Sequence, residues 1–436
     1  MVLGTVAVWY VGDVLYNEFG DYLEIIGSDS LTSAWWQVLW FLVVFGSLVV
    51  PVHHLVNQNH LRKKSRVVLY LKTSWLLMPD TQARIGKMTG MLFGVWVVLM
   101  LIALVQVRGN MLGLFAPYLG EKANPWARGQ IGGGFSALIS FASYVQIFLT
   151  AAFGVIAAIS MNRKTRALAL FVCFLAFPMY IFDRTRNTML AAILPGFLAF
   201  VFFRLRGGLP KKLSVLAVGF LCVNFWFSVV MANRSGMSFD IDSALSGSGA
   251  ADSKHEGLNM LEELAWIDLF IESGTYVQNN GQRYFAELVN PVPRALWKNK
   301  PTIGLDYAVA RGQNVAGPGG EVTATISTGM IGQGVVNFGR FFGPAAAAGL
   351  MAFWVALLAR QDLLGADPVR LILYGTGMVL TFNMGRDVTF LVLYPFVFGL
   401  FFTWYQKKVS GRGGKRLGQR ARRSLSSQNN RKKKWV

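Results

Sequence analysis

Apolar runs long enough to cross a lipid bilayer recur along this chain, and they limit its possible folds more than any other feature. The hydrocarbon core of a membrane requires about 20 apolar helical residues. The runs that reach or approach this length lie at 2–16, 35–55, 89–107, 137–160, 166–182, 188–203, 213–232, 342–359, 367–384 and 388–405. The sequence therefore predicts an all-α polytopic membrane protein with about ten transmembrane helices. Nine remain an alternative, because the first run is short, and the run 66–78 is interpreted as interfacial.

Composition supports this class and excludes others. Charged residues make up 15% of the chain, whereas soluble domains contain about 25%. The two cysteines, Cys173 and Cys222, fall inside apolar runs, so neither a disulfide framework nor a cysteine metal site is indicated. The net charge of +20 sits mostly beside the spans, which favours membrane orientation over nucleic-acid binding as its cause.

Basic residues in the connecting segments predict the orientation. Segments 56–88, 161–166 and 204–212 contain 14 Lys and Arg residues, whereas the alternating segments 12–34, 108–136 and 183–187 contain 5. Positively charged short loops stay in the cytoplasm. We therefore expect the first set and the C-terminus inside, and the long loop outside.

This orientation divides the chain into four parts. Residues 1–232 are expected to form seven transmembrane helices, 233–341 a large extracytoplasmic loop, and 342–405 three further transmembrane helices. The basic tail 406–436 contains 12 Lys and Arg residues and few apolar ones. Such a segment cannot bury a core, so we interpret it as disordered and as an anchor on anionic lipids.

Outward-facing arginines gather at the ends of spans. Arg184 and Arg186 lie in a short turn, Arg234 begins the long loop, and Arg386 lies in a second short turn. Arginine binds phosphate well because its planar fork donates paired hydrogen bonds and keeps its charge. These positions favour an anion site. The alternative is that the arginines reach the head groups without a ligand, with Asp183 as a partner of the first turn.

Within the long loop, residues 291–301 read PVPRALWKNKP. Proline restricts its own backbone and that of the preceding residue, so the segment is expected to be stiff and non-helical. Arg294, Lys298 and Lys300 could hold an anionic group, and Trp297 could lie against a sugar or the head groups. An ordinary basic loop tip is the alternative.

A glycine-rich region follows at residues 316–343. Its backbone permits close approach of a ligand, or it forms a re-entrant apolar segment covered by protein. The Lys-Ser/Thr pair of a phosphate-binding loop is missing, and no strand–turn–helix context for a dinucleotide site exists.

Outward acid–base candidates are few. His255 is the one outward histidine of the predicted topology, and Glu256 and Glu321 are among the outward acids. The acidic residues of segment 258–273 occur at helical spacing and are interpreted as a solvated face. No cluster has the spacing of a metal site.

Several of these residues form a familiar set. Pro293-Arg294, Trp297 and Lys300-Pro301 resemble the PR-x-x-W-x-x-KP element of Wzy-type oligosaccharide repeat-unit (O-antigen) polymerases. The segment from Gly332 through Gln333 and Asn337 to Gly339 resembles that family's GE-x-x-x-NFG element. Arg186 and Arg386 resemble its arginines beside later spans. Gln333 departs from the family's acidic residue, so it cannot serve as a carboxylate base.

The resemblance implies a metal-independent glycosyltransferase without a cofactor. Its substrates would be oligosaccharides linked to undecaprenyl pyrophosphate, polymerised at the outer face of a bacterial cytoplasmic membrane. Arg184, Arg186, Arg234, Arg294, Arg386, Trp297, Lys298, Lys300, Gln333 and Asn337 would bind pyrophosphate or glycan, with Glu321, His255 and Arg294 catalytic. A chain-length regulator and a flippase of the same pathway are the implied partners, besides membrane lipids.

Three alternatives remain. A ligase of related architecture would transfer finished glycan to another acceptor, and His255 would then gain weight as the base. A metal-using glycosyltransferase would need an acidic pair in the first outward loop, where Asp13, Glu18 and Asp21 are loosely spaced. A transporter or flippase would need charges inside the spans, whereas this chain keeps them at span ends.

Overall fold

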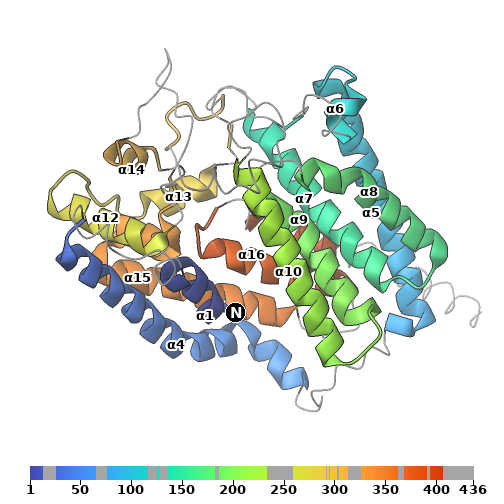
Figure 1. Ribbon diagram of the computed structural model, residues 1–436, viewed down its shortest axis with the longest axis horizontal. Coiled ribbons are helices and arrows are strands. Elements are labelled where there is room, and N and C mark those ends of the chain that lie inside the picture. The colour runs from blue at the N-terminus through green and yellow to red at the C-terminus, as the bar shows by residue number, and fades with distance from the viewer. Residues whose placement is uncertain are drawn as a thin grey trace, which may run out of the picture.

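The computed structural model describes thirteen parts of the chain, namely residues 1–12, 26–64, 76–115, 125–126, 136–181, 186–232, 259–290, 292–293, 295–301, 304–312, 326–361, 368–389 and 393–405. Within these parts every regular element is a helix (Figure 1). The predicted all-α class is therefore confirmed for them. The basic tail 406–436 and most of segment 66–78 lie outside the described residues.

Six helices in the described parts are long and apolar enough to cross a membrane. They are Ser28–Gln58, Pro79–Gln106, Phe141–Ile159, Arg163–Ile181, Leu209–Trp226 and Gly329–Arg360. Shorter apolar helices occupy Val2–Gly12, Thr188–Arg204 and Leu393–Tyr405. The architecture is that expected of a polytopic membrane protein, while the number of ten spans remains a prediction.

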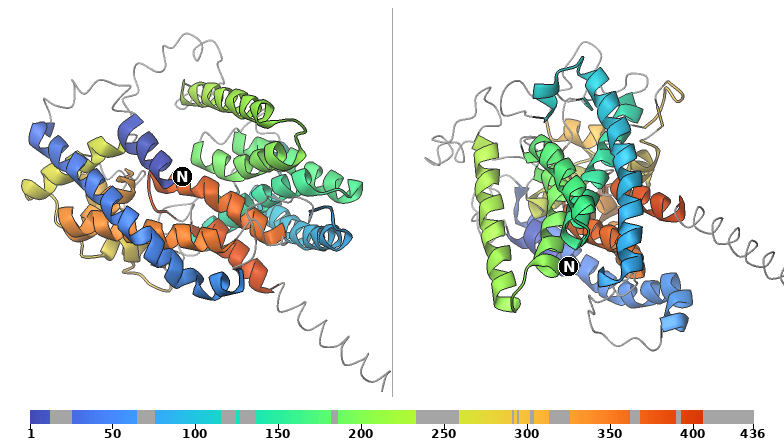
Figure 2. Two further views of the ribbon diagram at one scale, coloured as in Figure 1. Left: turned by 90° about the horizontal axis from the view of Figure 1, so that it is seen from below. Right: turned by 90° about the vertical axis from the view of Figure 1, so that its right-hand side faces the viewer.

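The helices form two groups joined by one element (Figures 1 and 2). In the first group, α4 (Ser28–Lys64) packs along α15 (Gly329–Arg360), and α12 (Met260–Glu272) covers both. In the second, α7 packs against α8, α9 and α5. Helix α16 contacts members of both groups. The other helices of these groups and their neighbours are α5 (Pro79–Gln106), α7 (Ser136–Ile159), α8 (Arg163–Ile181), α9 (Arg186–Ala199), η3 (Phe200–Arg204), α10 (Leu209–Ala232) and α16 (Pro368–Met384).

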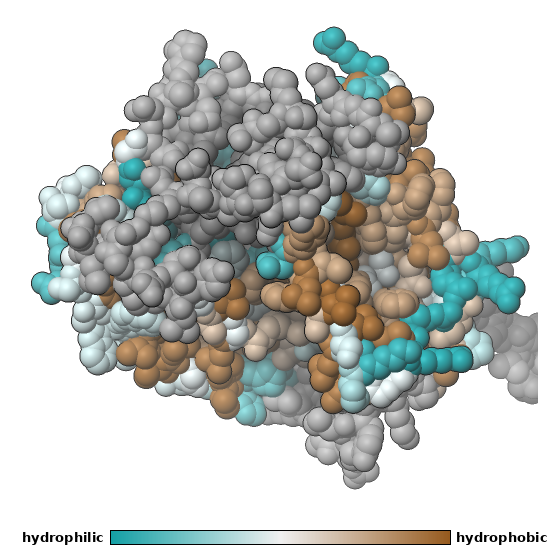
Figure 3. All heavy atoms as spheres, viewed as in Figure 1, coloured by the Kyte–Doolittle hydropathy of each residue, from teal (hydrophilic) through white to brown (hydrophobic). Residues whose placement is uncertain are grey.

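Exposed apolar side chains cover the outside of these helices. Figure 3 shows hydrophobic surface over the middle of the molecule and along its lower edge. In α10, Phe220 and Leu221 are 71% and 64% exposed. Soluble proteins rarely expose apolar surface on this scale, so these faces are suited to lipid.

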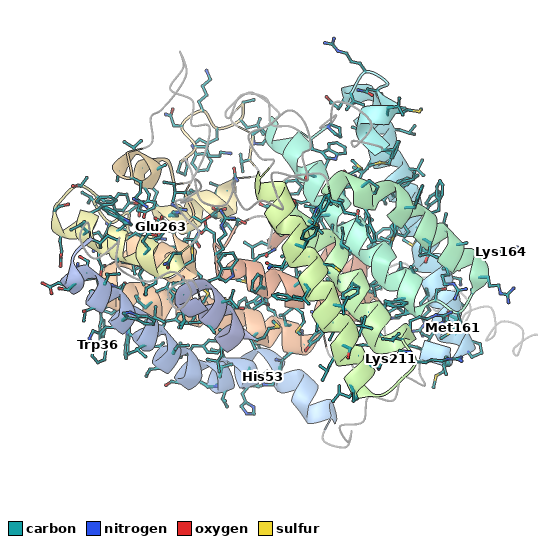
Figure 4. All side chains as sticks on the ribbon, viewed as in Figure 1. Trp36, His53, Met161, Lys164, Lys211 and Glu263 are labelled. Atoms are coloured by element: carbon teal, nitrogen blue, oxygen red, sulfur yellow. The ribbon has the colours of Figure 1, made fainter. Side chains whose placement is uncertain are left out.

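Residues of the two sets of connecting segments lie on different sides of the molecule. Figure 4 shows Met161, Lys164 and Lys211 along the right and lower margin, with His53 at the lower edge. Glu263, from the long loop, lies on the left at about mid-height. The side of the membrane on which each segment lies remains a prediction.

A pair of glycines sets the close contact between α7 and α9. A Cβ atom on Gly196 would lie 2.7 Å from the Cα of Gly154, and one on Gly154 would lie 3.0 Å from the Cα of Gly196. Small residues allow helix backbones to approach within a membrane, where lipid offers no hydrophobic drive for association. This contact holds the second group together beside α16.

Helix α15 consists of two pieces joined at Gly339. The backbone there has φ 77° and ψ 179°, a conformation open essentially only to glycine. Residues 329–337 are all buried, and a Cβ on Gly343 would lie 2.5 Å from the backbone of Gly334. Residues 329–337 of the glycine-rich region are thus helical and enclosed by protein, as the covered-segment interpretation expects, whereas its residues 316–325 lie outside the described part.

The N-terminal helices α1 (Val2–Val6) and η1 (Ala7–Gly12) pack on the other side of this enclosed piece. The Trp9 indole donates a hydrogen bond to the carbonyl of Phe382 at 2.8 Å. The Tyr10 hydroxyl accepts one from the amide of Ile331 at 2.9 Å. The described part of the first predicted span therefore packs against α15 and α16.

Candidate anion-binding site

The site forms where three segments distant in sequence meet. These are the enclosed start of α15, the turn after α16, and α13 (Gln282–Val289) in the long loop. Two buried side chains of the GQGVVNFG segment in α15 hold the other two segments. Side chains of α15 therefore position the other two segments of the site.

Asn337 fixes the beginning of α13. Its side-chain oxygen accepts hydrogen bonds from the backbone amides of Arg283 at 3.1 Å and Tyr284 at 3.5 Å. Its amide nitrogen donates to the carbonyl of Gln333 at 2.6 Å. The first amides of a helix lack partners within the helix, so Asn337 supplies them from another element. It thereby sets the position of the Arg283 side chain.

Gln333 fixes the turn that contains Arg386 and Asp387. Its side-chain oxygen accepts a hydrogen bond from the amide of Val388 at 3.0 Å, and its nitrogen contacts the carbonyl of Val388 at 3.5 Å. Both a donor and an acceptor are used, which a carboxylate cannot provide. This contact explains why glutamine is suited to a position where the resembling family carries an acid.

We expect Gln333→Glu to damage this turn. The carboxylate would lose the donor to Val388 and place a second negative charge near buried Asp387. An unsatisfied buried polar group costs roughly 1–3 kcal/mol, so the thermal midpoint of the purified protein should fall clearly. Gln361→Glu is the matched control, because Gln361 bonds only within its own helix end among the described contacts. Equal midpoints for both variants would contradict this role of Gln333.

Arg283 and Asp387 meet at the centre of the site. Their side chains are 1% and 11% exposed, and Nη2 lies 3.6 Å from Oδ2. This separation is long for a charge-assisted hydrogen bond, which usually measures about 2.8 Å. Nε and Nη1 of Arg283, and Oδ1 of Asp387, have no hydrogen-bond partner among the described residues. A buried arginine with two unused donor groups is arranged to accept an oxyanion.

Two neighbouring residues pack beside this guanidinium. Gly304 has φ 61°, and a Cβ on it would lie 2.5 Å from Nη1 of Arg283. Glycine therefore serves both the backbone conformation and the close approach at this position. The Tyr284 hydroxyl is buried without a partner among the described residues, and its burial raises its pKa. It consequently stays protonated and can donate.

Burial raises the pKa of the Asp387 carboxyl to about 6, against the lowering effect of Arg283 and Arg386. Desolvation disfavours the charged form of a carboxyl group, and the long contact with Arg283 compensates only in part. The Asp387 carboxylate therefore takes up a proton at a pH only slightly below neutral. Once Asp387 is protonated, its negative charge no longer competes with another anion for Arg283.

A second buried polar cluster is fully partnered. Glu263 is 0% exposed and accepts hydrogen bonds from Tyr307 and from Arg311, whose Nη2 lies 3.0 Å away. Arg311 also stacks over Trp266 at 4.5 Å. Complete pairing of this kind rigidifies a fold. The cluster therefore anchors α14 (Leu305–Ala310) on α12.

A third cluster joins α12 to the membrane helices. Asp268 is 0% exposed, accepts from Gln37 of α4 at 2.5 Å, and pairs with Arg340 of α15 at 3.1 Å. The solvated face predicted for segment 258–273 is therefore wrong for Glu263 and Asp268. The helix itself was predicted correctly. The residues from distant segments that pair with Glu263 and Asp268 could not be identified from the sequence.

The predicted site residues fall into three groups. Gln333 and Asn337 are completely buried, and Arg386 lies in the turn beside Asp387. Lys300 donates to the carbonyls of Asn290 and Val292 at 2.8 and 2.9 Å, which closes the 290–300 loop. Those outside the described residues are Arg184, Arg234, His255, Arg294 and Glu321, as are the alternatives Glu256, Asp13, Glu18 and Asp21.

The remaining predicted residues lie near the surface. Trp297 is half-buried, with its ring 6.1 Å from that of Phe285, and Lys298 is exposed. Arg186 begins α9, but its side chain is outside the described part. The predicted meeting of Arg186 and Arg294 with Arg386 is therefore untested. Within the described residues no group of His, Cys, Asp or Glu is placed to hold a metal ion.

Arg283 is the central residue that sequence reasoning missed. It lies four residues before Glu287 in QRYFAEL, on a short helix whose apolar residues fall on the opposite face. On a surface helix such a charged face usually contacts water. The sequence pattern therefore did not indicate that Arg283 belongs to a binding site. Asp387 was noticed only as a member of the Arg386 turn.

No protein-family model, curated protein or solved structure matches this chain. The resemblance to repeat-unit polymerases therefore rests on the short motifs alone.

Proposed function

We propose that this protein is a membrane glycosyltransferase that polymerises undecaprenyl-pyrophosphate-linked repeat units into a surface polysaccharide. One observation supports the proposal. The GQGVVNFG segment and the Arg386 turn meet at the buried Arg283, two of whose donor groups have no hydrogen-bond partner among the described residues. A polymerase of this class needs such a group, because its leaving group is a lipid pyrophosphate.

The proposed reaction transfers the growing glycan. A hydroxyl oxygen of the incoming unit attacks the anomeric carbon of the chain, and the bond from that carbon to the carrier pyrophosphate breaks. The pyrophosphate leaves with the electron pair, and the hydroxyl proton passes to a base. Arg283 and Arg386, with Tyr284 as a donor, would stabilise the charge on the leaving pyrophosphate. Glu321, then His255, remain the proposed bases.

The proposal needs no metal and no nucleotide sugar. It places the protein in a bacterial cytoplasmic membrane with its long loop outside and its C-terminus inside. The same pathway would supply a flippase and a chain-length regulator as partners. The carrier's hydrocarbon tail would lie in the membrane beside the helices.

The test is chain elongation in vesicles. The purified protein is reconstituted with lipid-linked repeat units, without an energy source, and the products are separated by size. We expect a ladder of chain lengths that persists in EDTA. A single transfer to another acceptor would identify a ligase, and transport without elongation would identify a transporter, so either result would overturn the proposal.

A further inference from the structure

Helix α13 is oriented opposite to an ordinary surface helix. Its charged residues Arg283 and Glu287 are 2% and 4% exposed, whereas Phe285 and Leu288 are 48% and 71% exposed. Residues three or four apart share one face of a helix, so the charged pair occupies one face and the apolar pair the other. A helix beside water turns its apolar face toward the core. The reverse orientation is favourable where the outer face meets an apolar medium.

Neighbouring residues extend this apolar surface beyond α13. Leu296 is 77% exposed, and Trp297 packs its ring against Phe285. The outer apolar face is defined here as Phe285, Leu288, Leu296 and Trp297. It combines large aliphatic residues with a tryptophan, a composition typical of segments that lie at the boundary between lipid head groups and acyl chains.

The outer apolar face continues into the lipid-facing surface of the membrane helices. Phe338 approaches Gly281 at the start of α13, where a Cβ would lie 3.5 Å from its ring. One helical turn later, Phe341 and Phe342 are 61% and 68% exposed at the start of the apolar part of α15. Trp40 of α4 stacks on Phe341 with 5.2 Å between the rings. The strip of apolar surface thus runs from α4 and α15 to α13.

We propose that the outer apolar face is a membrane-docking surface that lies in the same bilayer as the long helices. Its occupant is lipid hydrocarbon at head-group depth. Helix α13 would then lie along the membrane surface with Arg283 on its protein-facing side. This inference does not depend on the proposed reaction, although it would place the site at the level where lipid phosphates lie.

Fluorescence quenching in vesicles tests this surface. Cys173 and Cys222 are first replaced by alanine and serine, and a single cysteine is introduced as Leu288→Cys and labelled with a small environment-sensitive dye. The matched control is Val309→Cys on α14, since Val309 is also apolar and 48% exposed but lies outside the apolar strip. Phosphatidylcholine with a nitroxide on its acyl chain probes lipid contact, and iodide probes contact with water.

We expect the lipid nitroxide to quench the dye at 288 at least threefold more than the dye at 309, with iodide showing the reverse order. Strong iodide quenching at 288 without lipid quenching would mean that the face meets water, and would overturn the inference. Protection from both quenchers would mean that a second copy covers the face, which would overturn it equally. Elongation activity is not part of this readout, so failure here is distinct from failure of the proposed function.

Discussion

Replacing Arg283 by glutamine is expected to lower the rate of glycan elongation by about two to three orders of magnitude. Losing one preorganised donor to a developing oxyanion typically costs on the order of 3 kcal/mol in the transition state. Here the donor is charged, 1% exposed and protected from water, which strengthens its interaction with an anion. The measurement is the initial rate of elongation in vesicles with lipid-linked repeat units.

Two further variants separate chemistry from folding. Arg283→Gln alone leaves Asp387 buried without its cation, which destabilises the fold. The double variant Arg283→Gln, Asp387→Asn removes both charges and should recover the thermal midpoint while remaining inactive. Arg108→Gln is the matched control, because Arg108 is an exposed arginine in a segment predicted to face the same side. A double variant that elongates at the wild-type rate would show that Arg283 has no role in the reaction.

Anion binding should depend on pH through Asp387. The pKa of this carboxyl is raised from 3.8 to about 6, so the group is charged at pH 7.5 and mostly neutral at pH 5. The neutral form releases Arg283, and the affinity for a competing anion should rise about tenfold over this interval. The measurement is the increase in thermal midpoint caused by inorganic pyrophosphate at the two pH values.

The raised pKa of Asp387 also determines how the stability of the fold changes with pH. A raised pKa in the folded state means that the charged carboxylate opposes folding, so this group favours the folded state as pH falls through about 6 toward 3.8. Asp387→Asn removes the dependence and leaves Arg283 ready for pyrophosphate at both pH values. Any pH dependence that remains in this variant belongs to pyrophosphate itself. Equal dependence in wild type and Asp387→Asn would contradict the competition between carboxylate and anion.

The sequence allowed much of the fold to be predicted, because hydrophobic length alone identifies membrane-crossing helices. Six of the predicted spans correspond to helices long and apolar enough to cross a membrane. The run 2–16 remains a predicted span: its described part is a short apolar helix, Val2–Gly12, whose Trp9 and Tyr10 bond to residues more than 300 positions away. Apolar length does not distinguish a spanning helix from a short helix packed in protein.

The candidate site was predictable only in its motifs. Gln333 and Asn337 were identified from the resemblance and Arg386 from its position at a span end, but their physical roles depend on partners that the sequence does not reveal. Asn337 positions α13, and Gln333 positions the turn after α16. Lys300 was predicted to bind an anionic group, and its ammonium also donates to two carbonyls that close a loop. A cation in a sequence does not disclose whether its charge is already used.

The buried charges were the least predictable feature. Arg283, Glu263 and Asp268 each occur in a stretch that would be amphipathic on a surface helix. Their burial is stable because a partner from another segment faces each one, namely Asp387, Arg311 and Arg340. Unpaired burial of such groups would be strongly unfavourable. Only the three-dimensional structure reveals which surface of α12 and α13 is internal.

The central claim is that the carrier's pyrophosphate binds between Arg283 and the Arg386 turn. An electron cryo-microscopy structure of the protein with an undecaprenyl-pyrophosphate-linked repeat unit tests it most directly. We predict diphosphate density within hydrogen-bond distance of Nε or Nη1 of Arg283, with the carboxylate of Asp387 displaced from Nη2. Diphosphate density elsewhere, with the Arg283–Asp387 contact intact, would contradict the claim.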